Sequence, residues 1–171
     1  MFNKILEAMA GTPWWAWVAL FYVISIGILN LKTRVRQLYT IFILPTIFLV
    51  MFLQSLISNF GFSFYPWLIW LIALFAGLNL GWFLFINIQI KADRKKQLIK
   101  IPGSPATLIL VLLVFAVKYF FGYTQAVNPE FAQSLFFVNS KLISSGCIEG
   151  IFIGRVLFYL NKYFSVESED L

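Results

Sequence analysis

The sequence predicts an all-α membrane protein, a polytopic bundle of five transmembrane helices. Of its 171 residues, 61% are hydrophobic and only 12% are charged, and the mean hydropathy is +0.86. Soluble domains are typically about a quarter charged. A core of this size cannot hide the apolar excess, so a bilayer must solvate much of it. The sequence has long unbroken apolar runs, whereas a transmembrane barrel needs alternating segments of about ten residues.

Helix start signals divide the apolar sequence into its expected spans. The pairs Thr12–Pro13, Ser104–Pro105 and Asn128–Pro129 each combine an N-cap residue with a proline suited to a first helical turn. Pro45 falls inside the second span, where a proline bends the helix and frees a carbonyl. The expected spans are residues 14–31, 38–57, 66–88, 105–122 and 135–160 of a single domain, 1–171.

Basic residues gather on alternate connections between these spans. Three lysines or arginines lie in the first connection and five in the loop 89–104, and Lys162 follows the last span. The alternate segments hold only Lys4. By the positive-inside rule, we expect the N-terminus outside and the C-terminus inside. The acidic tail, 165–171, is polar and expected to fray.

The loop 89–104 carries the largest group of cations. Apolar residues alternate on either side of its charged centre, a pattern that fits a small β-hairpin. Beyond a role in topology, we expect its cations to contact anionic lipid headgroups. It lacks the glycine cradle of a nucleotide site, and we expect no nucleic-acid partner. The five cations are Lys91, Arg94, Lys95, Lys96 and Lys100.

The last span contains three ionisable residues, Lys141, Glu149 and Arg155. On a helix of about 3.6 residues per turn, Glu149 lies near 80° and Arg155 near −40° from Lys141, so all three share one arc. Lys141 and Arg155 have long side chains that can reach opposite interfaces. Glu149 cannot, so it is either protonated or met by a cation or polar cavity.

Two residues on other spans are candidate neighbours for Glu149. Lys118 on the fourth span and Asn79 on the third fall at comparable expected depths. Lys118 either extends to the outer interface or turns inward to the carboxyl group. The sequence therefore gives a candidate intramembrane polar site, which could equally be a structural buried pair.

Gly146, Gly150 and Gly154 recur every four residues on the opposite arc of the last span. Small residues at this spacing let another helix approach closely. The ridge fits packing within the chain and homodimerisation equally well. In both cases the last helix is expected to be enclosed by protein.

The chain has one cysteine, Cys147, and no histidine. This excludes an internal disulfide, the usual zinc ligand sets, histidine-ligated haem and Ser-His-Asp catalysis. We expect neither a metal nor another cofactor. Cys147 has no adjacent base and is expected to be a small buried apolar residue.

Several short motifs give the chain a family resemblance. The run from Ile101 to Pro105, followed by Phe115-x-x-Lys118-Tyr119-x-x-Gly122-Tyr123 and a later Gly154–Arg155, resembles a family of short bacterial inner-membrane proteins with no assigned function. The resemblance implies a multi-helix fold in the bacterial cytoplasmic membrane and a basic inner loop. It brings no catalytic residues with it.

Two functions fit these observations. The first is a non-enzymatic structural or accessory module that packs with itself or with a larger membrane complex. The second is a small transporter, channel or ligand-binding protein that uses the intramembrane polar site. An enzyme acting on lipid is a third option, although the sequence holds no conventional catalytic set.

Overall fold

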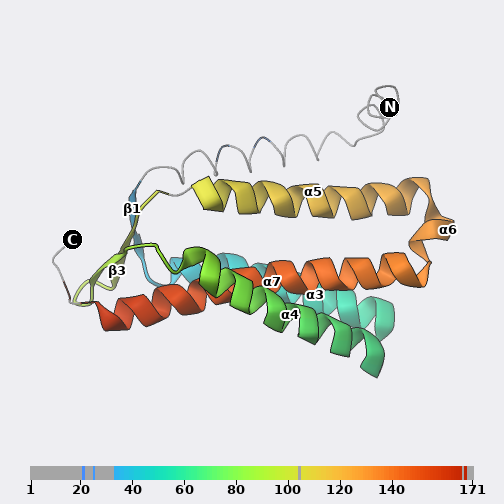
Figure 1. Cartoon of the computed structure of the whole chain (residues 1–171), viewed down its shortest axis with the longest axis horizontal. Helices are drawn as coiled ribbons and strands as arrows, with labels where there is room; N and C mark the ends of the chain where they lie inside the picture. The colour runs from blue at the N-terminus through green and yellow to red at the C-terminus, as the bar shows by residue number, and fades with distance from the viewer. Residues whose placement is uncertain (1–20, 22–24, 26–32, 104, 167, 169–171) are drawn as a thin grey trace. The chain divides into compact units, whose positions relative to one another are not determined.

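The computed structural model describes Phe21, Ser25, residues 33–103 and 105–166, and Ser168 (Figure 1). Most of the expected first span, 14–31, lies outside the described residues, as do Thr12–Pro13, Ser104 and the tail residues 167 and 169–171. Phe21 and Ser25 are both helical, and the Ser25 hydroxyl donates a hydrogen bond to the Phe21 carbonyl at 2.8 Å.

The described chain is mostly helical, with one small sheet. Among the described residues, four helices are long and apolar enough to cross a membrane, namely α3, α4, α5 and α7, which indicates a membrane protein. The five-span count and the orientation stay predictions. The elements are β1 (Arg34–Gln37), α3 (Thr40–Phe60), α4 (Phe64–Phe85), β2 (Lys91–Asp93), β3 (Leu98–Ile101), α5 (Pro105–Val127), α6 (Pro129–Ala132) and α7 (Leu135–Ser165).

Helix boundaries agree with the sequence at their starts more closely than at their ends. Pro105 begins α5 and Leu135 begins α7, as predicted. The Ser134 hydroxyl caps α7 by accepting a hydrogen bond from the Phe137 amide at 3.3 Å. The Asn128–Pro129 signal instead opens the four-residue helix α6.

The last helix is longer than a bilayer requires. With 31 residues, α7 extends about 46 Å at 1.5 Å per residue, against about 30 Å of hydrocarbon. It ends at Ser165 rather than at residue 160. Its final turns therefore have length to spare outside the apolar core.

The chain divides into two compact units. One comprises Met1–Lys32 and Gly103–Ala132, and its described part is α5 with α6. The rings of Phe115, Tyr119 and Tyr123 stack in sequence along α5, with centroids 6.2 and 6.1 Å apart. The other unit comprises Thr33–Pro102 and Gln133–Leu171, and it holds the sheet together with α3, α4 and α7.

Backbone contact joins α4 and α7, which run parallel (Figure 1). A Cβ atom added at Gly146 would lie 2.6 Å from the Trp70 carbonyl oxygen, and one added at Gly150 would overlap the backbone of Leu74. Gly154 meets Leu78 in the same way. The glycine ridge is therefore packed against α4 within the chain, which is one of the two packing roles that the sequence left open.

The facing surface of α4 carries its own small residues at four-residue spacing. A Cβ atom at Gly77 would overlap the Cys147 backbone, and one at Gly81 the Ile151 backbone. Ala73, one turn earlier, is 5% exposed. Because both helices lack side chains along this line, their backbones come into contact, which allows dispersion and weak Cα–H hydrogen bonds to form.

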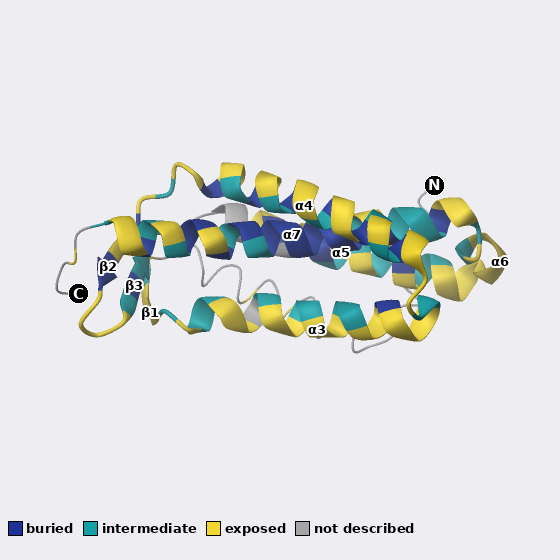
Figure 2. Cartoon of the chain, turned by 90° about the horizontal axis from the view of Figure 1, so that it is seen from below, coloured by how far each residue is buried: buried dark blue, intermediate teal, exposed yellow. Residues whose placement is uncertain are grey.

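The helix α3 runs antiparallel to α7 and packs through aromatic side chains. The Phe48 ring stacks on Phe152 at 5.6 Å, and the Phe52 ring stacks on Trp70 at 5.9 Å. Gly61, at φ +56°, ends α3 in a backbone conformation that favours glycine. Buried residues concentrate along α7, whereas much of α3 is exposed (Figure 2).

A three-stranded antiparallel sheet lies where α3 begins and where α4 and α7 end. The predicted hairpin is present as β2 and β3, and β1 from the first connection adds a third strand in the order β1-β3-β2. Sequence reasoning missed this strand because Arg34–Gln37 has little apolar alternation. The paired residues Ile99 and Ala92 are both 0% exposed and anchor the sheet.

Replacing Gly150 with alanine should separate α4 from α7, because the new methyl group would meet backbone atoms that cannot rotate away. We expect a loss of about 1–3 kcal/mol, as for other overpacked sites. The matched control is Gly122→Ala on α5, where a Cβ meets nothing within 4 Å and alanine favours the helix. Thermal unfolding in mild detergent measures the stability of both variants. Equal unfolding midpoints for the two variants would contradict the packing.

Candidate functional site

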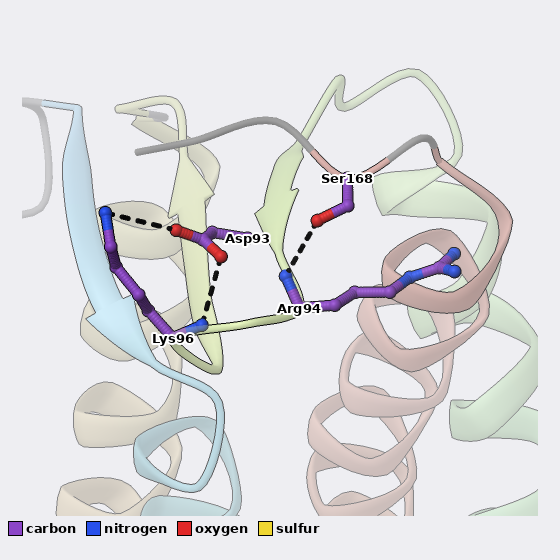
Figure 3. Close-up of polar contacts among 4 residues, drawn as sticks. All are labelled: Asp93, Arg94, Lys96 and Ser168. Carbon is purple, nitrogen blue, oxygen red and sulfur yellow. Dashed lines mark hydrogen bonds and ion pairs between the residues drawn. The ribbon is translucent and has the colours of Figure 1, made fainter.

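The turn between β2 and β3 is organised by a buried carboxylate. Asp93 is 1% exposed, and its Oδ1 atom accepts a hydrogen bond from the Lys96 amide at 3.0 Å (Figure 3). Its Oδ2 atom lies 3.6 Å from the Lys96 ammonium group. Gln97 closes the turn at φ +55°. Lys96 therefore contacts the buried carboxylate through both its backbone amide and its side chain.

Arg94 extends from the same turn toward the C-terminal end of α7. Its guanidinium group donates hydrogen bonds to the carbonyls of Phe164, Val166 (3.0 Å) and Tyr163 (3.4 Å). Helix ends leave carbonyls without intrahelical partners, and a cation there also opposes the helix dipole. Arg94 thus caps α7, and its predicted contact with lipid stays a prediction.

The chain after α7 is bound to β2. Ser168 forms a parallel bridge with Ala92, and its hydroxyl accepts a hydrogen bond from the Arg94 amide at 3.1 Å (Figure 3). Two independent contacts therefore tie β2 to the end of α7. They fix the sheet relative to that helix.

An open cleft of about 710 Å³ lies between the sheet, the connection from α4 to β2, and the end of α7. Three lysines line it: Lys91 from β2, Lys100 from β3 and Lys162 from the last turn of α7. No acidic residue is among the described residues that line it. The other lining residues are Thr33, Ile86, Asn87, Ile88, Gln89, Ile90, Pro102 and Val166.

Two of these lysines are direct cross-strand partners. Lys91 pairs with Lys100 in the register of β2 and β3, so their side chains leave the same face of the sheet. Cβ atoms of such partners are about 4.5–5.5 Å apart, and like charges directly opposite each other are destabilising. The arrangement favours an anion at this face.

The structure thus separates the five cations predicted to contact lipid into different roles. Lys91 and Lys100 line the cleft, Lys96 pairs with Asp93, and Arg94 caps α7. Lys95 is exposed in the turn and is not among the cleft residues. Predicting these differences needs the strand register, which charge counting does not supply.

Lys162 was not predicted as a site residue. The sequence indicated only that it follows the last span, and the length of α7 brings it to the sheet. Its ammonium group lies 5.9 Å from the centroid of the Phe158 ring, one turn earlier. The available signal was a helical pattern that continues past residue 160.

The intramembrane residues on α7 are only partly brought together. Glu149 is 2% exposed and Ser145, one turn earlier, is 7% exposed, so both are buried on the same face. The Ser145 hydroxyl donates hydrogen bonds to the carbonyls of Lys141 and Leu142, the second at 3.2 Å. The Lys141 side chain itself is half-buried.

Arg155 is held by aromatic rings. Its guanidinium carbon lies 4.8 Å from the centre of the Phe85 ring and 5.2 Å from that of Tyr159, and its Nε atom donates to the Tyr159 hydroxyl at 3.1 Å. Cation–π contacts of this kind stabilise a partly desolvated arginine. Arg155 therefore joins the end of α4 to α7.

Of the two predicted neighbours of Glu149, Asn79 faces away from α7, and Lys118 belongs to the other unit. Asn79 is exposed, and its amide donates to the Phe75 carbonyl at 2.8 Å. It stands about 200° around α4 from Gly77, on the face opposite the contact with α7. Lys118 is exposed on α5 in the other unit, so its pairing with Glu149 stays a prediction.

Comparison with known protein families matches residues 3–163 to a family described as being of unknown function, DUF6622. No curated protein and no solved structure matches the chain. The expected resemblance to a family without an assigned function is confirmed over nearly the whole chain.

Replacing Arg94 with glutamine should loosen the end of α7. Hydrogen bonds from a charged donor contribute about 1.5–3 kcal/mol when well made, and water around this exposed residue reduces that value. We expect faster amide hydrogen exchange in residues 160–166, measured by mass spectrometry. Lys95→Gln removes the same charge from the same turn and should leave that exchange unchanged. Equal exchange in the two variants would show that Arg94 does not cap the helix.

Proposed function

The chain belongs to DUF6622, a family of unknown function, and we propose that it is a non-enzymatic accessory protein of the bacterial cytoplasmic membrane that binds anionic lipid headgroups at its basic end. The observation that carries this proposal is the sheet. Its outer strands carry Arg34 and Arg36 from one connection and Lys91 from another to the same end of the helices, with the arginines on one face of the sheet and Lys91 on the other. Lys100 lies on the strand between them.

The electrostatics of a membrane surface suit this arrangement. A lysine or arginine close to an anionic leaflet contributes about 1 kcal/mol of attraction. The cations stand where apolar helices end, so they fall at headgroup depth if those helices cross the bilayer. A rigid sheet also holds them together without the entropy cost of ordering a flexible loop.

The helix directions agree with the alternation of the predicted spans, and the orientation with an outside N-terminus rests on the positive-inside rule. In that topology the third and fifth spans run the same way and the second runs against them. The parallel pair α4 and α7 and the antiparallel α3 have this relation. The sheet then belongs on the inner side, facing the anionic leaflet.

The accessory role follows from which surfaces are already used. Because the glycine ridge of α7 is filled by α4, it offers no contact for self-association. Large apolar side chains remain exposed on α3 and α4, including Ile47, Met51, Ile72 and Phe75. These surfaces are suited to lipid or to a larger membrane complex.

A transporter or ligand-binding protein centred on Glu149 is the alternative. The burial of Glu149 and Ser145 favours it, because an ionisable residue within a membrane span commonly has a functional role. Asn79, however, stands on the outward face of α4, which removes one of the polar groups that this site was expected to contain. The basic end is therefore better supported as the functional site than the region around Glu149.

The proposal predicts selective retention of anionic lipid. The protein should be placed in nanodiscs containing equal amounts of phosphatidylglycerol and phosphatidylcholine and then released for native mass spectrometry. We expect phosphatidylglycerol to be retained preferentially, with the preference falling as salt rises because exposed charges are screened. Arg36→Gln should weaken the preference more than Lys4→Gln, which removes the same charge from the predicted outer side. Equal retention of the two lipids would overturn the proposal.

A further inference from the structure

The cleft beside the sheet has a feature that general attraction to a membrane does not require. Lys91 and Lys100 oppose each other across two strands, and Lys162 from α7 completes the group of three. Dispersed cations would serve a charged surface equally well. Three that line one cleft give a single anion more than one ammonium group to contact.

We infer that this cleft binds a single phosphate group through Lys91, Lys100 and Lys162. The inference rests on the proposed function and makes it more specific, from a charged surface to one defined site. Lysine ammonium groups are common phosphate ligands and act as point charges. Three of them carry more positive charge than the negative charge of a phosphate monoester, about −1.5 to −2 near neutral pH, or of a diester.

The lining of the cleft suits the remainder of such a ligand. Its volume of about 710 Å³ lies within the range of about 300–1,000 Å³ that is typical of small-molecule sites. Asn87, Gln89 and Thr33 supply amide and hydroxyl groups for polar atoms beside the phosphate. Ile86 and Ile88 supply apolar surface. The described lining thus combines charge, hydrogen-bonding groups and an apolar wall.

One nearby feature opposes anion binding. The C-terminal end of a helix carries a partial negative charge, and the residue that follows α7, Val166, lines the cleft. Arg94 offsets this effect, because its guanidinium group binds the Val166 and Phe164 carbonyls. The cap on α7 therefore also preserves the positive potential of the cleft.

The phosphate could come from a lipid headgroup or from a soluble phosphate compound, and both share the chemistry that the lysines recognise. The experiment uses the full chain in phosphatidylcholine nanodiscs and adds either phosphatidylglycerol or inorganic phosphate. Native mass spectrometry gives the dissociation constant of the first phosphatidylglycerol, and phosphorus NMR gives that of inorganic phosphate. Saturation by one probe but not the other identifies the source, and either result supports the site if the lysine dependence below holds.

The variants are Lys100→Gln, Lys162→Gln and the control Lys95→Gln, which removes one charge from the same end of the molecule but outside the cleft. We expect about a tenfold weaker first binding step for each cleft variant, equivalent to about 1.4 kcal/mol for one charge-assisted contact. The control should change it by less than about twofold, as expected of an exposed charge. Lys100→Arg should restore binding, and matching circular dichroism spectra establish that the variants fold.

Two results would overturn the inference, and they can be told apart. If all three glutamine variants weaken binding equally while phosphatidylglycerol is still preferred to phosphatidylcholine, the cleft is no defined site and the proposed function stands. If neither probe binds and no lipid preference remains, the proposed function falls as well.

Discussion

Direct backbone contact between α4 and α7 is the constraint on which the rest of the unit depends. Each helix carries small residues four positions apart, and each glycine of the series faces backbone atoms of the other helix. Lipid tails are as apolar as leucine, so burial alone gives helices in a bilayer little reason to associate. In place of hydrophobic burial, the close approach of the two backbones provides dispersion attraction along the whole contact. The aromatic pairs that attach α3 then add to a pair that is already fixed.

The position of the sheet follows from this pair. Because α4 and α7 run parallel, their C-terminal ends lie together, and β2 begins a short connection after α4. Arg94 and Ser168 then fasten β2 to the end of α7. The extra length of α7 carries Lys162 to the same place. The basic cleft is thus assembled from segments far apart in sequence, and helix packing within the membrane determines its geometry.

The sequence predicted the helices, the hairpin and the close-packing role of Gly150 because each depends on a local pattern. The partner of the ridge was also visible in Gly77 and Gly81, although nothing local shows that these two series face each other. The separate roles of Arg94 and Lys100 could not be predicted, because both are simply cations in a basic loop. Strand register and the length of α7 distinguish them, and both are properties of the folded chain.

The central claim is that contact between α4 and α7 holds the basic end in place. Hydrogen–deuterium exchange in nanodiscs tests it most directly, by comparing the native chain with Gly150→Ala and following the amides of β2 and β3. Gly150 lies on α7 well before its end, so the sheet can respond only through the helices. The account predicts faster exchange in residues 91–101 of the variant. Unchanged exchange there, alongside faster exchange in α4 and α7, would show that the sheet forms independently of the helix pair and would contradict the claim.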